Sequence, residues 1–146
     1  MKFFSTIVAV IALATSASAA FSSCGAADDD FTFSGVTYTP NPPKVNQDVC
    51  ITLTGSLKDD VTAGATIHVS ATFWGISVYD QTSDLCDALV GGANPCPILA
   101  STTSVTHCIT VPSNVPAGVS INLKAVVTNA DGGRVFCIGG PMTFSN

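Results

Sequence analysis

The sequence predicts an all-β domain of the immunoglobulin-like β-sandwich class. Apolar residues recur at every second position in six or seven short segments, turn residues separate these segments, and no segment keeps a helical spacing. The 146 residues are enough for one domain of ordinary size. The acids, all Asp, number 10 against 5 Lys and Arg, which gives a net charge of −5. A chain this acidic is not expected to bind nucleic acid, whose phosphates attract clustered Lys and Arg.

Residues 1–20 predict a secretory signal peptide, which leaves residues 21–146 as the folded domain. Lys2 gives a positive start, an apolar stretch follows, and small residues around Ala17 and Ala19 fit a cleavage site. A membrane anchor is the alternative, but the apolar stretch is only about half of the ~20 residues that a spanning helix needs. We therefore expect an oxidising destination, either secreted or in the vacuolar or lysosomal lumen.

Each predicted strand has one apolar and one polar face. The alternation changes register near Gly35, which indicates a β-bulge in the first strand. Residues 131–133 favour a hairpin turn before the last part of the chain. The longest segment without a predicted strand is 81–100. The alternating segments are 31–38, 49–53, 67–73, 105–111, 119–127, 135–138 and 142–144.

The six Cys indicate three disulfides rather than metal ligands or free thiols, because the destination is oxidising and the count is even. Cys50 and Cys108 lie on the outward faces of two strands that are neighbours in an immunoglobulin-like order, so a cross-strand bridge is reasonable. Cys86 and Cys96 flank a short segment and would close a local loop. The remaining two would tie the N-terminal segment to the last strand.

Several segments, taken in order, resemble the ML lipid-recognition family. They are an early Cys24 followed by TPNPPKVNQ, a central GATIHVSATFWGI, the Cys loop DLCDALVGGANPCP, the strand entry VPSNVPAGVSINLKAVVTNADG and the terminal RVFCIGGPMTF. They span about residues 24 to 144. The likeness is greatest to the family's fungal phosphatidylglycerol/phosphatidylinositol transfer proteins, and the Niemann-Pick type C sterol carrier is another member. The resemblance implies the bridges Cys24–Cys137 and Cys86–Cys96, whereas Cys50–Cys108 lies outside the family pattern.

The resemblance also implies a sandwich with a lipid cavity between its two sheets. An apolar pocket removes the free-energy cost of exposing an acyl chain or a sterol to water. Periodicity alone favours a packed core for the inward residues, and the resemblance favours a cavity lining for some of them. The segment from Trp74 to Tyr79 carries apolar residues on both faces, which indicates a portal rim or a surface covered by the Cys86–Cys96 loop. The lipid-binding candidates are Val49, Ile51, Ile67, Val69, Phe73, Trp74, Ile76, Val78, Tyr79, Val111, Val115, Ile121, Leu123 and Phe136.

The polar side chains form no recognisable catalytic or metal-binding motif. The sequence has no Gly-x-Ser-x-Gly, no His-Glu-x-x-His and no Glu, so no enzyme activity, metal or cofactor is expected. His107 lies on an apolar face and is expected to be a hydrogen-bonded core histidine, with a contact to a lipid headgroup as the alternative. His68 is expected to be solvated, and Asp28 to Asp30 a flexible, solvated run rather than a cation site.

The function expected from these observations is lipid binding and transfer by a monomer. It would take a single lipid ligand, either phosphatidylglycerol or phosphatidylinositol or else a sterol, and move it between membranes through transient membrane contact. Two alternatives are a lipid-recognition accessory, which presents lipid to a receptor or hydrolase, and a non-catalytic adhesion-type sandwich. A carrier retains lipid through gentle purification, whereas an adhesion module does not.

Overall fold

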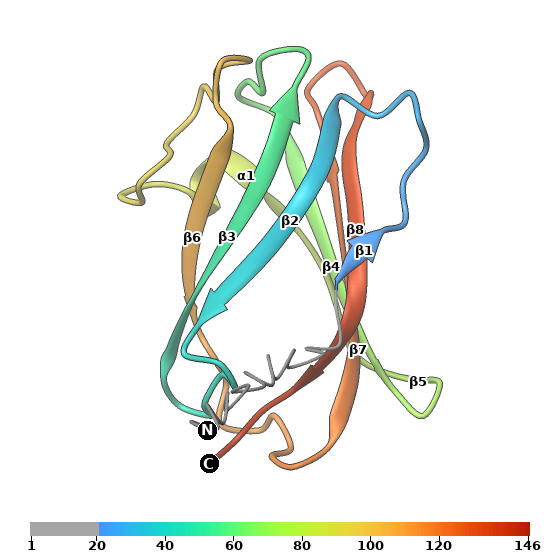
Figure 1. Cartoon of the computed structure of the whole chain (residues 1–146), viewed down its shortest axis with the longest axis vertical. Coiled ribbons are helices and arrows are strands. Elements are labelled where there is room, and N and C mark those ends of the chain that lie inside the picture. Colours follow the sequence, from blue (N-terminus) through green and yellow to red (C-terminus); the bar gives the residue numbers. More distant parts are fainter. Residues whose placement is uncertain (1–20) are drawn as a thin grey trace, which may run out of the picture.

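The computed structural model describes residues 21–146 as two antiparallel sheets packed face to face (Figure 1). The larger sheet has the strand order β1-β8-β7-β4-β5, and the smaller sheet has the order β2-β3-β6. The elements are β1 (Ser22–Ser23), β2 (Phe31–Thr39), β3 (Asp48–Leu57), β4 (Thr66–Phe73), β5 (Ile76–Asp84), α1 (Leu85–Ala88), β6 (Ser104–Thr110), β7 (Ser120–Thr128) and β8 (Arg134–Thr143). The predicted sandwich is confirmed, while the predicted signal peptide lies outside the described residues.

Period-2 alternation located most strands correctly because one face of each packs inward. In β3, Val49 is buried, whereas Asp48 before it is exposed. The predicted bulge is also confirmed, since the β2–β3 pairing shifts register between Phe33 and Gly35.

The segment 81–100 was expected to lack strands, and this prediction is wrong in its first part. Residues Ile76–Asp84 form the separate strand β5, which pairs antiparallel with β4 along its whole length. Every residue of β5 is exposed, so this edge strand has no buried face and shows no alternation of the kind that reveals a strand. The segment from Trp74 to Tyr79 therefore consists of a turn and the start of this edge strand.

A second difference concerns the end of the chain. The segments 135–138 and 142–144 were expected as separate strands, but β8 runs unbroken from Arg134 to Thr143 and pairs with β7 throughout. The residues between the two segments are Gly139, Gly140 and Pro141, which carry no alternating side chains. Their backbones nevertheless stay in register opposite β7, so the pattern is interrupted while the strand is not.

All three expected disulfides are present, and none joins one sheet directly to the other. Cys50 and Cys108 lie directly opposite each other on β3 and β6 of the smaller sheet. Cys24–Cys137 fastens the segment after β1 to β8, within the larger sheet. Cys86–Cys96 closes the loop that leads from β5 to β6.

The apolar interior consists of two clusters. The first, here called the cavity cluster, has the buried residues Phe31, Val61, Ala65, Leu85, Leu89, Ile98, Val127 and Val135. The second, here called the solid cluster, has the buried residues Val49, Ala71, Val111, Ile121, Met142 and Phe144. Because Leu85 belongs to α1, the cavity cluster lies at the end of the sandwich that α1 occupies (Figure 1).

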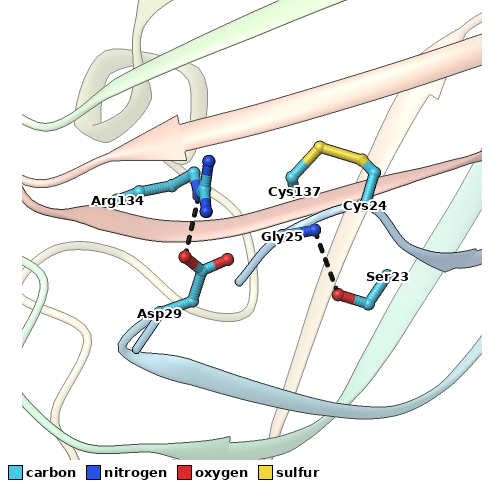
Figure 2. A network of polar contacts seen from close by, with 6 residues as sticks. All are labelled: Ser23, Cys24, Gly25, Asp29, Arg134 and Cys137. Atoms are coloured by element: carbon cyan, nitrogen blue, oxygen red, sulfur yellow. Dashed lines mark hydrogen bonds and ion pairs between the residues drawn. A yellow bond between two sulfur atoms is a disulfide. The ribbon is translucent and has the colours of Figure 1, made fainter. Parts of the chain in front are cut away.

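The N-terminal acidic run contains an ion pair whose carboxylate is buried, which corrects the expectation that the whole run is solvated. The side chain of Asp29 is 7% exposed and accepts a hydrogen bond of 2.8 Å from Nε of Arg134 (Figure 2). The backbone N–H of Asp30 donates to the carbonyl of Arg134. These contacts join the chain entering β2 to the start of β8, and therefore link the two sheets beside the cavity cluster.

Candidate functional site

A cavity of about 110 Å³ lies between the two sheets at the α1 end of the sandwich. Both sheets contribute side chains to it, and α1 with the loop that follows closes one side. The lining is formed by Phe31, Leu53, Leu57, Val61, Ile67, Leu85, Leu89, Ile98, Thr102, Val105, His107, Val127, Val135 and Phe136. Twelve of these 14 side chains are apolar, so the cavity suits a ligand that avoids water.

The wall formed by α1 and its loop is held by local polar bonds. The side chain of Asp84 caps α1 by accepting a hydrogen bond of 2.9 Å from the N–H of Asp87. This short helix directs Leu85 and Leu89 inward, where both are buried. Further along the loop, Ile98 exchanges two backbone hydrogen bonds of 2.9 Å with Val61. α1 is therefore capped at its start and the loop after it is joined to Val61, which keeps the apolar residues of both in the lining.

His107 and Thr102 are the two polar residues of the lining. His107 lies on β6, the edge strand of the smaller sheet, and its side chain is partly buried. A hydrogen bond to another residue was expected for it, but within residues 21–146 its ring has no such partner. His68 does have one, because its Nε2 lies 2.9 Å from Oδ1 of Asp80 on the exposed outer surface.

The predicted lipid-binding residues lie in different regions of the structure. Ile67 and Phe136 line the cavity. Val69 and Phe73 are partly buried in β4 and belong to neither cluster. A third group packs in the solid cluster at the other end of the interior, and it consists of Val49, Ile51, Val111, Val115, Ile121 and Leu123. Alternation separates inward from outward residues, but it does not say at which end of the sandwich the sheets leave space.

The remaining candidates are exposed at the tip of the β4–β5 hairpin, here called the hairpin patch. It consists of Trp74, Ile76, Val78 and Tyr79, whose exposed fractions are 88%, 68%, 51% and 44%. Phe73, next to the patch, is six positions from Ile67 along β4, a distance of about 20 Å. The hairpin patch and the cavity therefore lie toward opposite ends of the same pair of strands, and the Cys86–Cys96 loop does not cover the patch (Figure 1).

The structure adds lining residues that the sequence reasoning missed. Leu85 and Leu89 come from α1 and its C-cap, and Val61 and Ile98 come from loops. None of the four lies in an alternating segment, so the alternation of apolar residues did not predict that they face inward. No signal in the sequence marked them, since Val90, which is next to Leu89 in the same loop, is equally apolar and is 74% exposed.

In the part of the chain that the structure describes, His, Cys, Asp and Glu side chains form no group of three or more that is placed to hold a metal ion. No helix within residues 21–146 combines the length and apolarity needed to cross a bilayer.

Comparison with known proteins identifies one family. The ML domain model matches residues 18–144. A phosphatidylglycerol/phosphatidylinositol transfer protein of Aspergillus fumigatus is 31% identical over 103 residues, which are 70% of this chain and 58% of the relative. The protein of the same description from Neurospora crassa is 28% identical over 117 residues, covering 80% of this chain and 66% of the relative. The chain therefore spans roughly three fifths of the length of these curated relatives.

Solved structures show the same fold. A Niemann-Pick type C2 protein from Japanese carpenter ant superimposes with a TM-score of 0.62 at 14% identity, covering 86% of this chain and 98% of that one. Chicken MD-1, solved in complex with lipid IVa, gives a TM-score of 0.57 at 18% identity, covering 84% of this chain and 87% of that one. At these identities the likeness concerns the fold alone.

Proposed function

This chain belongs to the ML-domain family, and from that premise we propose that it binds one lipid between its two sheets and transfers it between membranes without hydrolysing it. The observation that carries the proposal is the apolar cavity, which takes side chains from both sheets and from α1. Phosphatidylglycerol and phosphatidylinositol are the first ligands to test, because the similar fungal proteins carry those names. A sterol is the second. We also propose that residues 21–146 form the lipid-recognition domain, with 1–20 as its signal peptide.

Binding a full lipid requires the sheets to separate further. The cavity of about 110 Å³ is smaller than the ~300–1,000 Å³ that ligand pockets occupy. The disulfides allow such a movement, because two of them lie within one sheet each and the third joins α1 to the loop that follows it. Each sheet is thus reinforced internally while the contact between the sheets stays non-covalent.

The proposed place of action is an oxidising compartment outside the cytosol. Three disulfides with no free Cys among the described residues fit a secreted or lumenal protein. Within that range we propose secretion or the vacuolar or lysosomal lumen, and a monomer as the working form. Lipid transfer requires transient membrane contact, because the lipid leaves one membrane surface and enters another.

The hairpin patch is the surface that we propose for this contact. Trp74 has a φ of 52° in the two-residue turn before β5, a position at which Asn, Asp or Gly is preferred. Turn propensity therefore does not explain a Trp there. Its indole group is amphipathic, as are the aromatic side chains that gather at membrane interfaces.

Replacing Ile76 or Val78 by Asp is expected to slow lipid transfer between vesicles by about tenfold, because a charge in the patch must lose its water at the membrane. The measurement is transfer of a fluorescent phospholipid from donor to acceptor vesicles. Thr82→Asp is the matched control, since Thr82 is also exposed on β5 but lies beyond the patch. Equal rates for all three variants and the wild type would place the membrane contact elsewhere.

Native mass spectrometry of gently purified protein tests the function itself. A carrier shows the mass of one bound lipid, and lipid extraction then identifies its class. Wild-type protein that neither retains nor transfers phosphatidylglycerol, phosphatidylinositol or a sterol would contradict the proposal and favour the adhesion-type sandwich.

A further inference from the structure

Two of the three disulfides contain an exposed cysteine, namely Cys108 in the bridge to Cys50 and Cys24 in the bridge to Cys137. In the third bridge both cysteines are half-buried. The partners of the two exposed cysteines differ, because Cys50 is half-buried on the outer face of the smaller sheet whereas Cys137 is 3% exposed. Thiol–disulfide exchange requires that a thiolate reach a sulfur atom, so accessibility favours the bridge Cys50–Cys108.

Small side chains surround this bridge on the outer face of the smaller sheet. Its neighbours in the β-ladder on that face are Thr39, Thr52, Thr106, Asp48 and Thr110. None of them carries a ring that would shield the sulfur atoms. A reductant can therefore approach the bridge from solvent.

The strand that carries Cys108, β6, is fastened less firmly than the other edge of the smaller sheet. The opposite edge strand β2 is joined to the larger sheet by the ion pair of Asp29 with Arg134 and by Phe31 and Phe136, whose ring centroids lie 5.7 Å apart. Among residues 21–146, no hydrogen bond, ion pair or aromatic pair joins β6 to the larger sheet. Ile109 has inward parity on β6 and is nevertheless 44% exposed, so the larger sheet leaves this part of β6 uncovered.

The same strand forms part of the cavity wall, since Val105 lines the cavity from β6. Strand β6 is held to β3 by the backbone ladder, by side-chain hydrogen bonds of 2.8 Å and 2.6 Å, and by the disulfide. The disulfide is the covalent one of these links. Its loss would leave this wall of the cavity held at one edge by hydrogen bonds alone.

We propose that Cys50–Cys108 is a site of thiol–disulfide exchange for a dithiol reductant, and that its reduction loosens β6 and releases lipid from the cavity. A thiolate of the reductant attacks Sγ of Cys108, the S–S bond breaks, and Cys50 leaves as a thiolate that takes up a proton. The second thiol of the reductant then displaces Cys108, so the protein gains two electrons and two protons and the reductant becomes a disulfide. The release of lipid rests on the proposed function and goes beyond it, because it adds a regulatory site outside the cavity.

The β3–β6 ladder makes the exchange reversible. It continues on both sides of the bridge, with Val49 opposite Ile109 and Ile51 opposite His107. The two thiols therefore stay opposite each other after reduction, and an oxidant can restore the bond. Cys24, by contrast, follows a strand of two residues, so the ladder beside its own bridge is short.

Graded reduction followed by alkylation tests the exchange site without any lipid. Native protein is treated with increasing dithiothreitol, free thiols are blocked with iodoacetamide, and peptide mass mapping identifies the modified cysteines. Cys50 and Cys108 should react at a dithiothreitol concentration about tenfold lower than the other four cysteines. Amide hydrogen exchange should then rise in β6 and stay unchanged in β7, which is an inner strand of the larger sheet. Equal reaction of all three bridges, or earlier reaction of Cys24, would contradict the assignment.

Lipid release tests the consequence for the cavity. Protein loaded with phosphatidylglycerol is reduced at the concentration at which Cys50 and Cys108 alone react, and native mass spectrometry follows the bound lipid. Release should be about tenfold faster than from oxidised protein. The double variant Cys50→Ala/Cys108→Ala should release lipid at the fast rate with or without dithiothreitol. The matched control Thr52→Val/Thr106→Val removes the neighbouring side-chain hydrogen bond between the same two strands, and it should keep the response to the reductant.

The outcomes separate this inference from the proposed function. If the protein holds no lipid in either redox state while the bridge still opens first and β6 loosens, lipid binding fails and the exchange site is supported. If the bridge opens first while hydrogen exchange in β6 and lipid release both stay at the rates of the oxidised protein, the bridge does not control the cavity wall and the inference is wrong. Both results come from reduction of the wild type, so they do not depend on the folding of the double variant.

Discussion

Val105→Phe should lower lipid retention by at least about tenfold while the protein stays folded. Val105 lines the cavity from β6, so a larger ring at this position occupies space that the ligand would need. Overfilling a packed core costs roughly 1–3 kcal/mol, but here the ring enters an existing cavity, and the change in the free energy of unfolding should stay near the bottom of that range. The measurements are native mass spectrometry for retention and urea denaturation for stability.

The matched control for this substitution is Ile109→Phe. Ile109 lies on the same strand, but it is 44% exposed and does not line the cavity. Its replacement should change neither retention nor stability appreciably. Undiminished retention by Val105→Phe would mean that lipid does not occupy this cavity, and the solid cluster with Val49 and Ile121 would then be the region to examine.

Arg134→Leu should destabilise the fold by about 2–4 kcal/mol, because it leaves the buried carboxylate of Asp29 without its charged partner. The reverse change, Asp29→Asn, should cost less than this, since the Arg134 side chain is 41% exposed and stays hydrated when its partner becomes neutral. The two losses of stability differ because Asp29 is the desolvated member of the pair and Arg134 is not. Urea denaturation of both single variants and of the double variant measures both losses.

The exposed pair of His68 and Asp80 serves as the comparison. Its side chains are 40% and 64% exposed, and exposed ion pairs contribute about 0–1 kcal/mol, so Asp80→Asn should have little effect. The packing around Asp29 is close: a Cβ at Gly25 would collide with the Asp29 carboxylate, which would then have to move from its present position. Equal, small losses for Arg134→Leu and Asp80→Asn would show that the Asp29 pair does not hold the sheets together.

The sequence by itself determined the sandwich class, most strands and the bulge at Gly35, and it made a cross-strand bridge between Cys50 and Cys108 reasonable, which the structure then confirmed. These features follow from period-2 alternation, which is local and visible wherever one face of a strand packs against the opposite sheet. The resemblance of several ordered segments to the ML family added the other two disulfides and the expectation of a lipid ligand.

The tertiary structure alone decided which inward residues face open space. Val49 and Ile67 have the same inward parity on their strands, yet the first packs in the solid cluster and the second lines the cavity. The difference depends on how far apart the sheets lie at each end and on where α1 and its loop close the gap. Neither quantity is encoded in the alternation of one strand.

The tertiary structure also decided features that have no periodic signature. The edge strand β5 is exposed along its whole length, and Asp29 is buried only because Arg134, far away in sequence, lies beside it. His107 gains its place in the lining in the same way, from elements that meet around it. An alternating pattern predicts on which face of its own sheet a side chain lies. The burial of a charge and the position of a cavity depend instead on contacts between segments that are distant in the sequence.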